Sequence, residues 1–100
     1  MAEQQNQPGQ QQIQLRASDA DMKGVYSNMA MVAHTQEEFI LDFMNIMGQG
    51  GTLSARVIVS PGHMKRLILA LEDNMKKYEG QFGNVTPASV PQPSEIGFKT

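Results

Sequence analysis

Two histidines, His34 and His63, are the side chains of this sequence that most readily exchange protons or bind a metal at neutral pH. They lie far apart in the chain, outside the spacing of metal ligands, and the sequence has no cysteine that could complete a thiolate site. We therefore expect no metal centre and no bound cofactor.

A cluster of basic side chains follows a serine and a proline near the middle of the chain. His63, Lys65 and Arg66 fall in the first turn of a predicted helix, where free backbone N–H groups attract anions. Pro61 removes one of those donors, so a solvated basic turn competes with an anion contact. The three residues remain a candidate anion contact.

Other fragments of known motifs are incomplete. Asp19 and Asp21 resemble the start of a calcium loop, but the closing glutamate does not follow. The glycine-rich segment 48–51 lacks the lysine of a P-loop, and no G-x-S-x-G occurs around any serine. We predict that the protein is not an enzyme, with no catalytic residues.

Composition limits the class of protein. One hundred residues suit a single domain, whose small size leaves a thin margin of stability. Eight basic and ten acidic side chains give a net charge of −2, which argues against a dedicated nucleic-acid binder. The absence of cysteine, of a signal-like start and of a long apolar run predicts a cytoplasmic protein that does not contact the membrane.

The strongest structural pattern is an amphipathic helix over residues 60–82. Ser60 is a good N-cap, Pro61 suits the first helical position, and Gly80 and Gly83 offer exits at the far end. Apolar residues recur at three- and four-residue steps and form one stripe: Met64, Leu67, Ile68, Leu71, Met75, Tyr78 and Phe82.

The two ends of the chain differ in composition from the middle. Residues 1–12 contain six glutamines, and residues 84–100 contain three prolines without apolar periodicity. We predict disordered tails at 1–12 and 84–100 flanking a single α+β domain at 13–83.

Four segments before the helix have strand character. Residues 13–17 alternate weakly, residues 25–34 are rich in β-branched and methionine side chains, and residues 38–47 form a third candidate whose length also allows a helix. The glycine-rich segment 48–51 then predicts a hairpin to a strand at 52–60. The expected fold is an antiparallel sheet of three to four strands followed by one long helix.

A hairpin of this kind separates two apolar sheet faces. One face would carry Phe39, Leu41 and Phe43 with Leu53, Ala55, Val57 and Val59, and we expect the helix to cover it. One register with a five-residue loop sets Asp42 opposite Arg56, although the sequence leaves that pairing open.

The second face has no element to cover it. Large apolar groups on a small protein usually mark an interface, so we predict a homodimer or higher oligomer. The sequence does not decide whether the strand at 25–34 adds Met29 and Met31 or Val32 to this second face. The candidate interface residues are Met29, Met31, Ile40, Met44, Ile46 and Ile58.

The motifs VYSN, EFILDF and ARVIVSP, followed by HMKRLILALEDNMKKYEGQFG, resemble a family of small, mostly bacterial proteins classed as a domain of unknown function. The resemblance covers about residues 15–83 and implies no activity. The order of sheet and helix is also similar to that of the export chaperone SecB, at the level of fold alone.

Three functions remain open. The first is a non-catalytic homo-oligomeric scaffold or protein-binding module, and the second is a SecB-like holdase whose methionine-rich strands bind unfolded polypeptide. The third is nucleic-acid binding, if an oligomer gathers the cations Arg16, Lys23, Arg56, Lys65, Arg66, Lys76 and Lys77.

Overall fold

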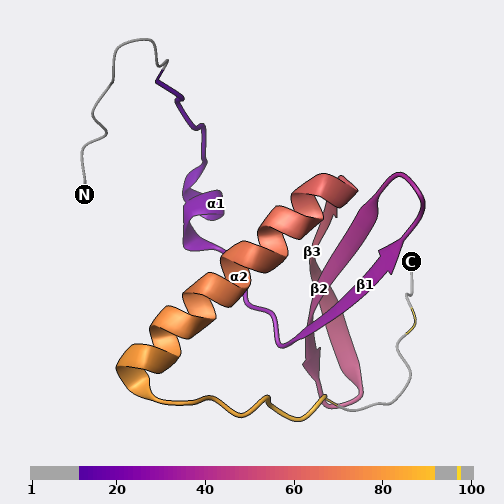
Figure 1. Cartoon of the computed structure of the whole chain (residues 1–100). Helices are drawn as coiled ribbons and strands as arrows, with labels where there is room; N and C mark the ends of the chain where they lie inside the picture. Colours follow the sequence, from indigo (N-terminus) through magenta and orange to yellow (C-terminus); the bar gives the residue numbers. More distant parts are fainter. Residues whose placement is uncertain (1–11, 92–96, 98–100) are drawn as a thin grey trace.

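The computed structural model describes residues 12–91 and residue 97, and the predicted glutamine-rich tail lies almost entirely outside them. It has a short helix, three strands and a long helix (Figure 1): α1 (Asp19–Lys23), β1 (Met29–His34), β2 (Phe39–Met47), β3 (Gly50–Val59) and α2 (Pro61–Phe82). The strands form one antiparallel sheet in the order β1-β2-β3. The predicted α+β arrangement of a sheet followed by a C-terminal helix is confirmed.

The chain before β1 differs from the prediction. Residues 13–17 form no strand, and Ile13 and Leu15 are 76% and 90% exposed. The segment lies apart from the sheet (Figure 1), and a strand without a neighbouring strand has no partner for its backbone hydrogen bonds. The expected first strand is therefore wrong, and the sheet has three strands among the described residues.

The short helix α1 is fixed by its own side chains. Ser18 accepts a hydrogen bond from the Asp21 backbone N–H at 3.1 Å, and Asp21 accepts one from the Ser18 backbone N–H at 3.0 Å. This capping box explains why a single helical turn forms at residues 19–23.

The hairpin between β2 and β3 is tighter than the predicted loop. Met47 pairs with Gly50, which leaves only Gly48 and Gln49 in the turn. Gly48 has a φ of +61°, a conformation that glycine adopts without strain at the first central position of a hairpin turn. A bulge then shifts the register, so that Phe43 pairs with Ala55 but Met44 pairs with Leu53.

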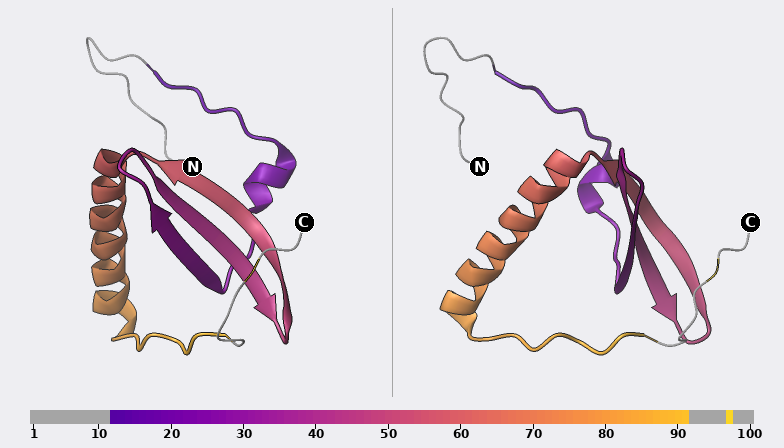
Figure 2. Two further views of the ribbon diagram at one scale, coloured as in Figure 1. Left: turned by 90° about the vertical axis from the view of Figure 1, so that its right-hand side faces the viewer. Right: turned by 45° about the vertical axis from the view of Figure 1, so that its right-hand side comes forward.

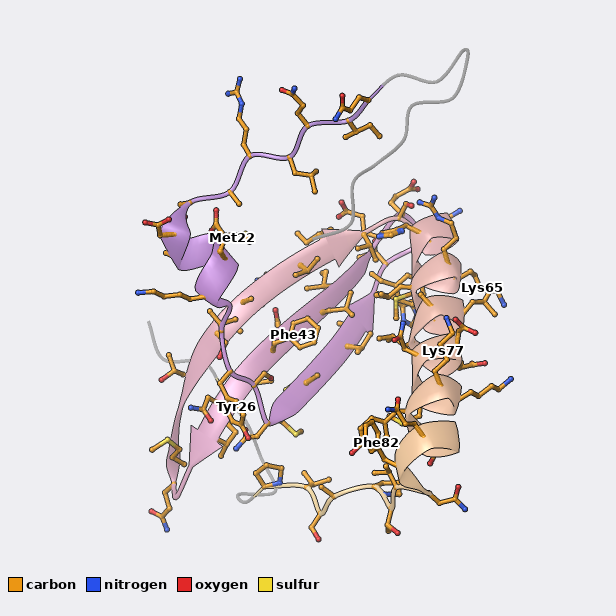
Figure 3. The ribbon with its side chains drawn as sticks, turned by 90° about the vertical axis from the view of Figure 1, so that its left-hand side faces the viewer. Met22, Tyr26, Phe43, Lys65, Lys77 and Phe82 are labelled. Carbon is orange, nitrogen blue, oxygen red and sulfur yellow. The ribbon has the colours of Figure 1, made fainter. Side chains whose placement is uncertain are left out.

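Register and alternation divide the sheet into two faces. We call one the Phe face, and Figure 3 shows its Phe43 on the side where both helices lie. The opposite side we call the Met face. The Phe face consists of Ala30, Val32, His34, Phe39, Leu41, Phe43, Ala55, Val57 and Val59; the Met face consists of Met29, Met31, Ala33, Ile40, Asp42, Met44, Ile46, Leu53, Arg56 and Ile58. Leu53, predicted beside Ala55, is moved by the bulge to a position opposite Met44.

The long helix begins where predicted but does not cover the sheet. Ser60 caps it by accepting a hydrogen bond from the His63 backbone N–H at 3.1 Å, and Pro61 occupies its first turn. Figure 2 shows α2 leaving the end of β3 and diverging from the sheet along its length. No residue of α2 is buried, so the expectation that the helix covers the Phe face is wrong for this single chain.

Candidate functional site: the Met face of the sheet

The six predicted interface residues come together on one face. Met31 pairs with Asp42 and Met29 pairs with Met44, which resolves the side that β1 presents. Ile40 pairs with Ile58 across the other strand boundary, and Ile46 shares the parity of Met44 on β2. The Met face therefore joins side chains from all three strands.

The Met face is buried at its centre and exposed at its margins. Met44 is 2% exposed, while Met29, Ile40 and Ile46 are half-buried. Met31 and Ile58, on the two outer strands, are 39% and 52% exposed. The outer strands therefore supply the apolar surface that a partner would contact.

An ion pair lies within this apolar face. The Arg56 guanidinium donates through Nε to Asp42 Oδ1 at 2.7 Å and through Nη2 to Asp42 Oδ2 at 2.8 Å. The Asp42 side chain is 10% exposed and that of Arg56 is 50% exposed. The predicted cross-strand pair is present, although the connecting turn is shorter than the five-residue loop assumed for it.

The pair lowers the pKa of Asp42 and provides hydrogen-bond donors to its carboxylate. The hydrogen bonds from Arg56 lower the pKa of Asp42 below its usual 3.8, against a smaller opposing effect of burial. Because both carboxylate oxygens already have a charged donor, a partner could cover this centre without leaving the carboxylate unpaired.

Side chains of the VYSN segment extend the sheet beyond β1. The Asn28 side chain donates to the Ile46 carbonyl and accepts from the Ile46 backbone N–H, both at 2.8 Å. Ser27 Oγ donates to the carbonyls of Met29 and Met44 at 3.0 Å, and Ser54 Oγ donates to the Tyr26 carbonyl at 2.8 Å. These hydrogen bonds hold the segment before β1 against the end of the hairpin. The apolar periodicity of the sequence does not indicate them.

The candidate anion contact is only partly assembled. His63 Nδ1 lies 3.1 Å from Arg66 Nη2, whereas Figure 3 shows Lys65 on the side of α2 that points away from the sheet. The Ser60 hydroxyl already occupies the His63 backbone N–H. The structure thus brings His63 and Arg66 together and places Lys65 apart from them (Figure 3), and the anion contact stays a prediction.

The cations that nucleic-acid binding would need are partly engaged in ion pairs. Arg56 binds Asp42, and Lys77 Nζ lies 3.0 Å from Asp73 Oδ2 one helical turn earlier. Within the described part of the chain, no group of three histidines or acidic residues could hold a metal ion. No described helix combines the length and apolar character needed to cross a membrane.

Comparison with known proteins identifies a family for this chain but assigns it no function. One family model matches residues 1–87, a range that includes the whole sheet and both helices. The description of that family assigns no activity. No curated protein and no solved structure matches the chain.

Proposed function

The chain belongs to the family described as protein of unknown function (DUF3467), and from that premise we propose that it is a non-catalytic protein-interaction module that assembles with itself through the Met face. One observation carries the proposal. Among the described residues only Leu41, Asp42 and Met44 are buried. A chain with so small a core needs apolar contacts from outside to be stable.

The Met face has the composition of an interface. Its outer residues Met31 and Ile58 are exposed and apolar, and the only charges on it form a hydrogen-bonded pair. Flexible thioether side chains adapt to the surface that they contact, which suits a face built around three methionines. A second copy or another protein would therefore bury apolar area here at little electrostatic cost.

The chemistry of the site supports binding rather than catalysis. Asp42 is the buried titratable residue of the described chain, and both of its oxygens accept hydrogen bonds from Arg56. A carboxylate held in this way is a weak base, because its pKa is lowered rather than raised toward neutrality. The module then acts by bringing chains together.

Size-exclusion chromatography with light scattering on Ile58→Glu tests the proposal. We expect the wild-type chain to elute as an oligomer at micromolar concentration. The variant should lose association, because the glutamate at position 58 would place a charge on the Met face. Leu69→Glu is the matched control, since Leu69 is also an exposed apolar residue but lies on the outer side of α2. A wild-type monomer, or an Ile58→Glu variant of unchanged mass, would contradict self-assembly through this face.

A further inference from the structure

α2 and the Phe face diverge from a common end, and we call the angle between them the wedge. Figure 2 shows the two diverging from the end of β3, and Figure 3 shows Phe82 on the side of α2 that faces the sheet. Near the start of α2, Met64 and Leu67 are half-buried, whereas Leu71 is 61% exposed. The distal half of the apolar stripe therefore faces the wedge without contacting the sheet opposite it.

The connection between β3 and α2 consists of a single residue. Ser60 alone separates Val59, the end of β3, from Pro61, the start of α2. Its hydroxyl and carbonyl accept hydrogen bonds from the backbone N–H groups of His63 and Met64, and proline fixes its own φ. These bonds fix Ser60 to the first turn of α2, and the distal half of the stripe is left uncovered by the sheet of its own chain.

We propose that the distal half of α2 packs onto the Phe face of a second copy, whose own α2 packs in return onto the first. The proposal rests on the self-assembly proposed above and names a second contact, on the opposite side of the sheet from the Met face. Each copy carries both the stripe and the surface that receives it, as a twofold interface requires.

The two surfaces match in length and in charge. The distal half of α2, residues 71–82, spans roughly 18 Å, which fits within the roughly 33 Å of the ten residues of β3. The stripe and the Phe face contain no lysine, arginine, aspartate or glutamate, and His34 is the one titratable side chain among them apart from Tyr78, so their contact would bury no unpaired acidic, lysine or arginine side chain. Neither surface needs to be reshaped for the contact.

The area is sufficient for a stable dimer. Large apolar side chains bury roughly 150–250 Å² each, so burying the exposed half of the four distal stripe residues, Leu71, Met75, Tyr78 and Phe82, removes roughly 300–500 Å² per copy. The receiving sheet would lose a similar area, so each copy would bury roughly 600–1,000 Å², a range that includes the roughly 800 Å² per partner of a standard interface. A second copy is thus an adequate occupant of the wedge.

We call this reciprocal packing of α2 on the Phe face of the other copy the exchange. Disulfide trapping between two full-length single-cysteine chains tests it. The natural sequence has no cysteine, so Leu71→Cys on the stripe and Val57→Cys on the Phe face place one thiol in each chain. After mixing under a mild oxidant, with one chain carrying a mass tag, we expect the mixed disulfide between positions 71 and 57 to form. Leu69→Cys is the control, because Leu69 is 63% exposed yet lies off the stripe, and it should yield at least tenfold less mixed product.

Two other outcomes would overturn the exchange. Equal trapping at positions 69 and 71 would show random collision, and an intrachain disulfide in the double variant Leu71→Cys/Val57→Cys, with no mixed product, would show that α2 closes on its own sheet. The result is independent of the Met face. If Ile58→Glu lowers the mass but no mixed disulfide forms, the proposed function stands and the exchange fails; if the disulfide forms while Ile58→Glu has no effect, the exchange stands and the Met-face contact fails.

Discussion

The ion pair formed by Asp42 and Arg56 could be predicted from the sequence only in part. The sequence suggested the pairing because strand alternation and a short loop bring opposite charges together across a hairpin. The structure adds the bidentate geometry and the burial of the carboxylate, which depend on neighbours from all three strands. Strand alternation in the sequence placed Asp42 on the side of Ile40, Met44 and Ile46, whereas the burial of its carboxylate was not visible.

Replacing Asp42 by asparagine should flatten the acid limb of the stability curve. The folded-state pKa of Asp42 is lowered from 3.8 because Arg56 donates to the carboxylate, so the contribution is full above the unfolded value and is lost as the pH falls through the folded value. Urea unfolding of wild type and Asp42→Asn from pH 5 to pH 2 measures this. The variant should be less stable near pH 5 and lose less stability on acidification.

Asp21 provides the comparison for that experiment. Its pKa is also lowered, by the hydrogen bond from the Ser18 backbone, but its carboxylate caps the exposed helix α1 away from the sheet. We expect Asp21→Asn to change the acid limb less, because few contacts of the sheet depend on α1. Parallel curves for wild type and Asp42→Asn would show that the ion pair does not link folding to pH.

Asn28 carries a role that sequence reasoning did not find. Its side-chain amide bonds both backbone groups of Ile46, in the manner of one more strand residue. Asn28→Ala should lower the free energy of unfolding by about 1 kcal/mol, because two hydrogen bonds at the end of the sheet are lost. Chemical denaturation at a fixed protein concentration measures the change.

Asn45→Ala is the matched substitution for that measurement. The Asn45 amide lies 3.7 Å from the sulfur of Met47, a weak interaction, so its loss should have little effect. Equal destabilisation by the two substitutions would show that Asn28 matters only as a polar strand-end residue.

At the scale of elements, sequence signals that act within one turn predicted the limits of α2 correctly. Features that depend on the pairing of two strands were not predicted. The limits of α2 follow from Ser60, Pro61 and Gly83, which act within one turn of the helix ends. Residues 13–17 have strand alternation, but a strand also needs a free edge beside it, which no local pattern encodes. The bulge opposite Phe43 and Met44 is likewise a property of the pair of strands, and it displaces Leu53 from the predicted face.

The position of α2 depends both on local sequence signals and on its tertiary placement against the sheet. The sequence correctly predicted the helix and its limits, and the helix lies on the expected side of the sheet (Figure 3). The angle between helix and sheet, in contrast, is a tertiary feature that the apolar period of a helix does not encode. Cover of the distal half of the stripe by a second copy stays a prediction.

For the whole molecule, the described chain buries few residues on its own. The margins of its Met face are exposed, its long helix contributes no buried residue, and its core is limited to the centre of β2. The two proposed contacts lie on opposite sides of the sheet, and each supplies apolar burial that the single chain lacks. Assembly and stability should therefore be linked.

That linkage predicts that thermal unfolding depends on protein concentration. For a dimer that dissociates as it unfolds, a tenfold rise in concentration adds about 1.4 kcal/mol to the stability of each dimer, which should raise Tm by about 3–6 °C. Circular dichroism melts over a hundredfold range of concentration measure the shift. Leu69→Glu should retain it and Ile58→Glu should reduce it, because only Ile58 lies on the Met face. A Tm that stays constant over that range would mean that the single chain is stable with its apolar faces in water, and self-assembly would then have no role in its folding.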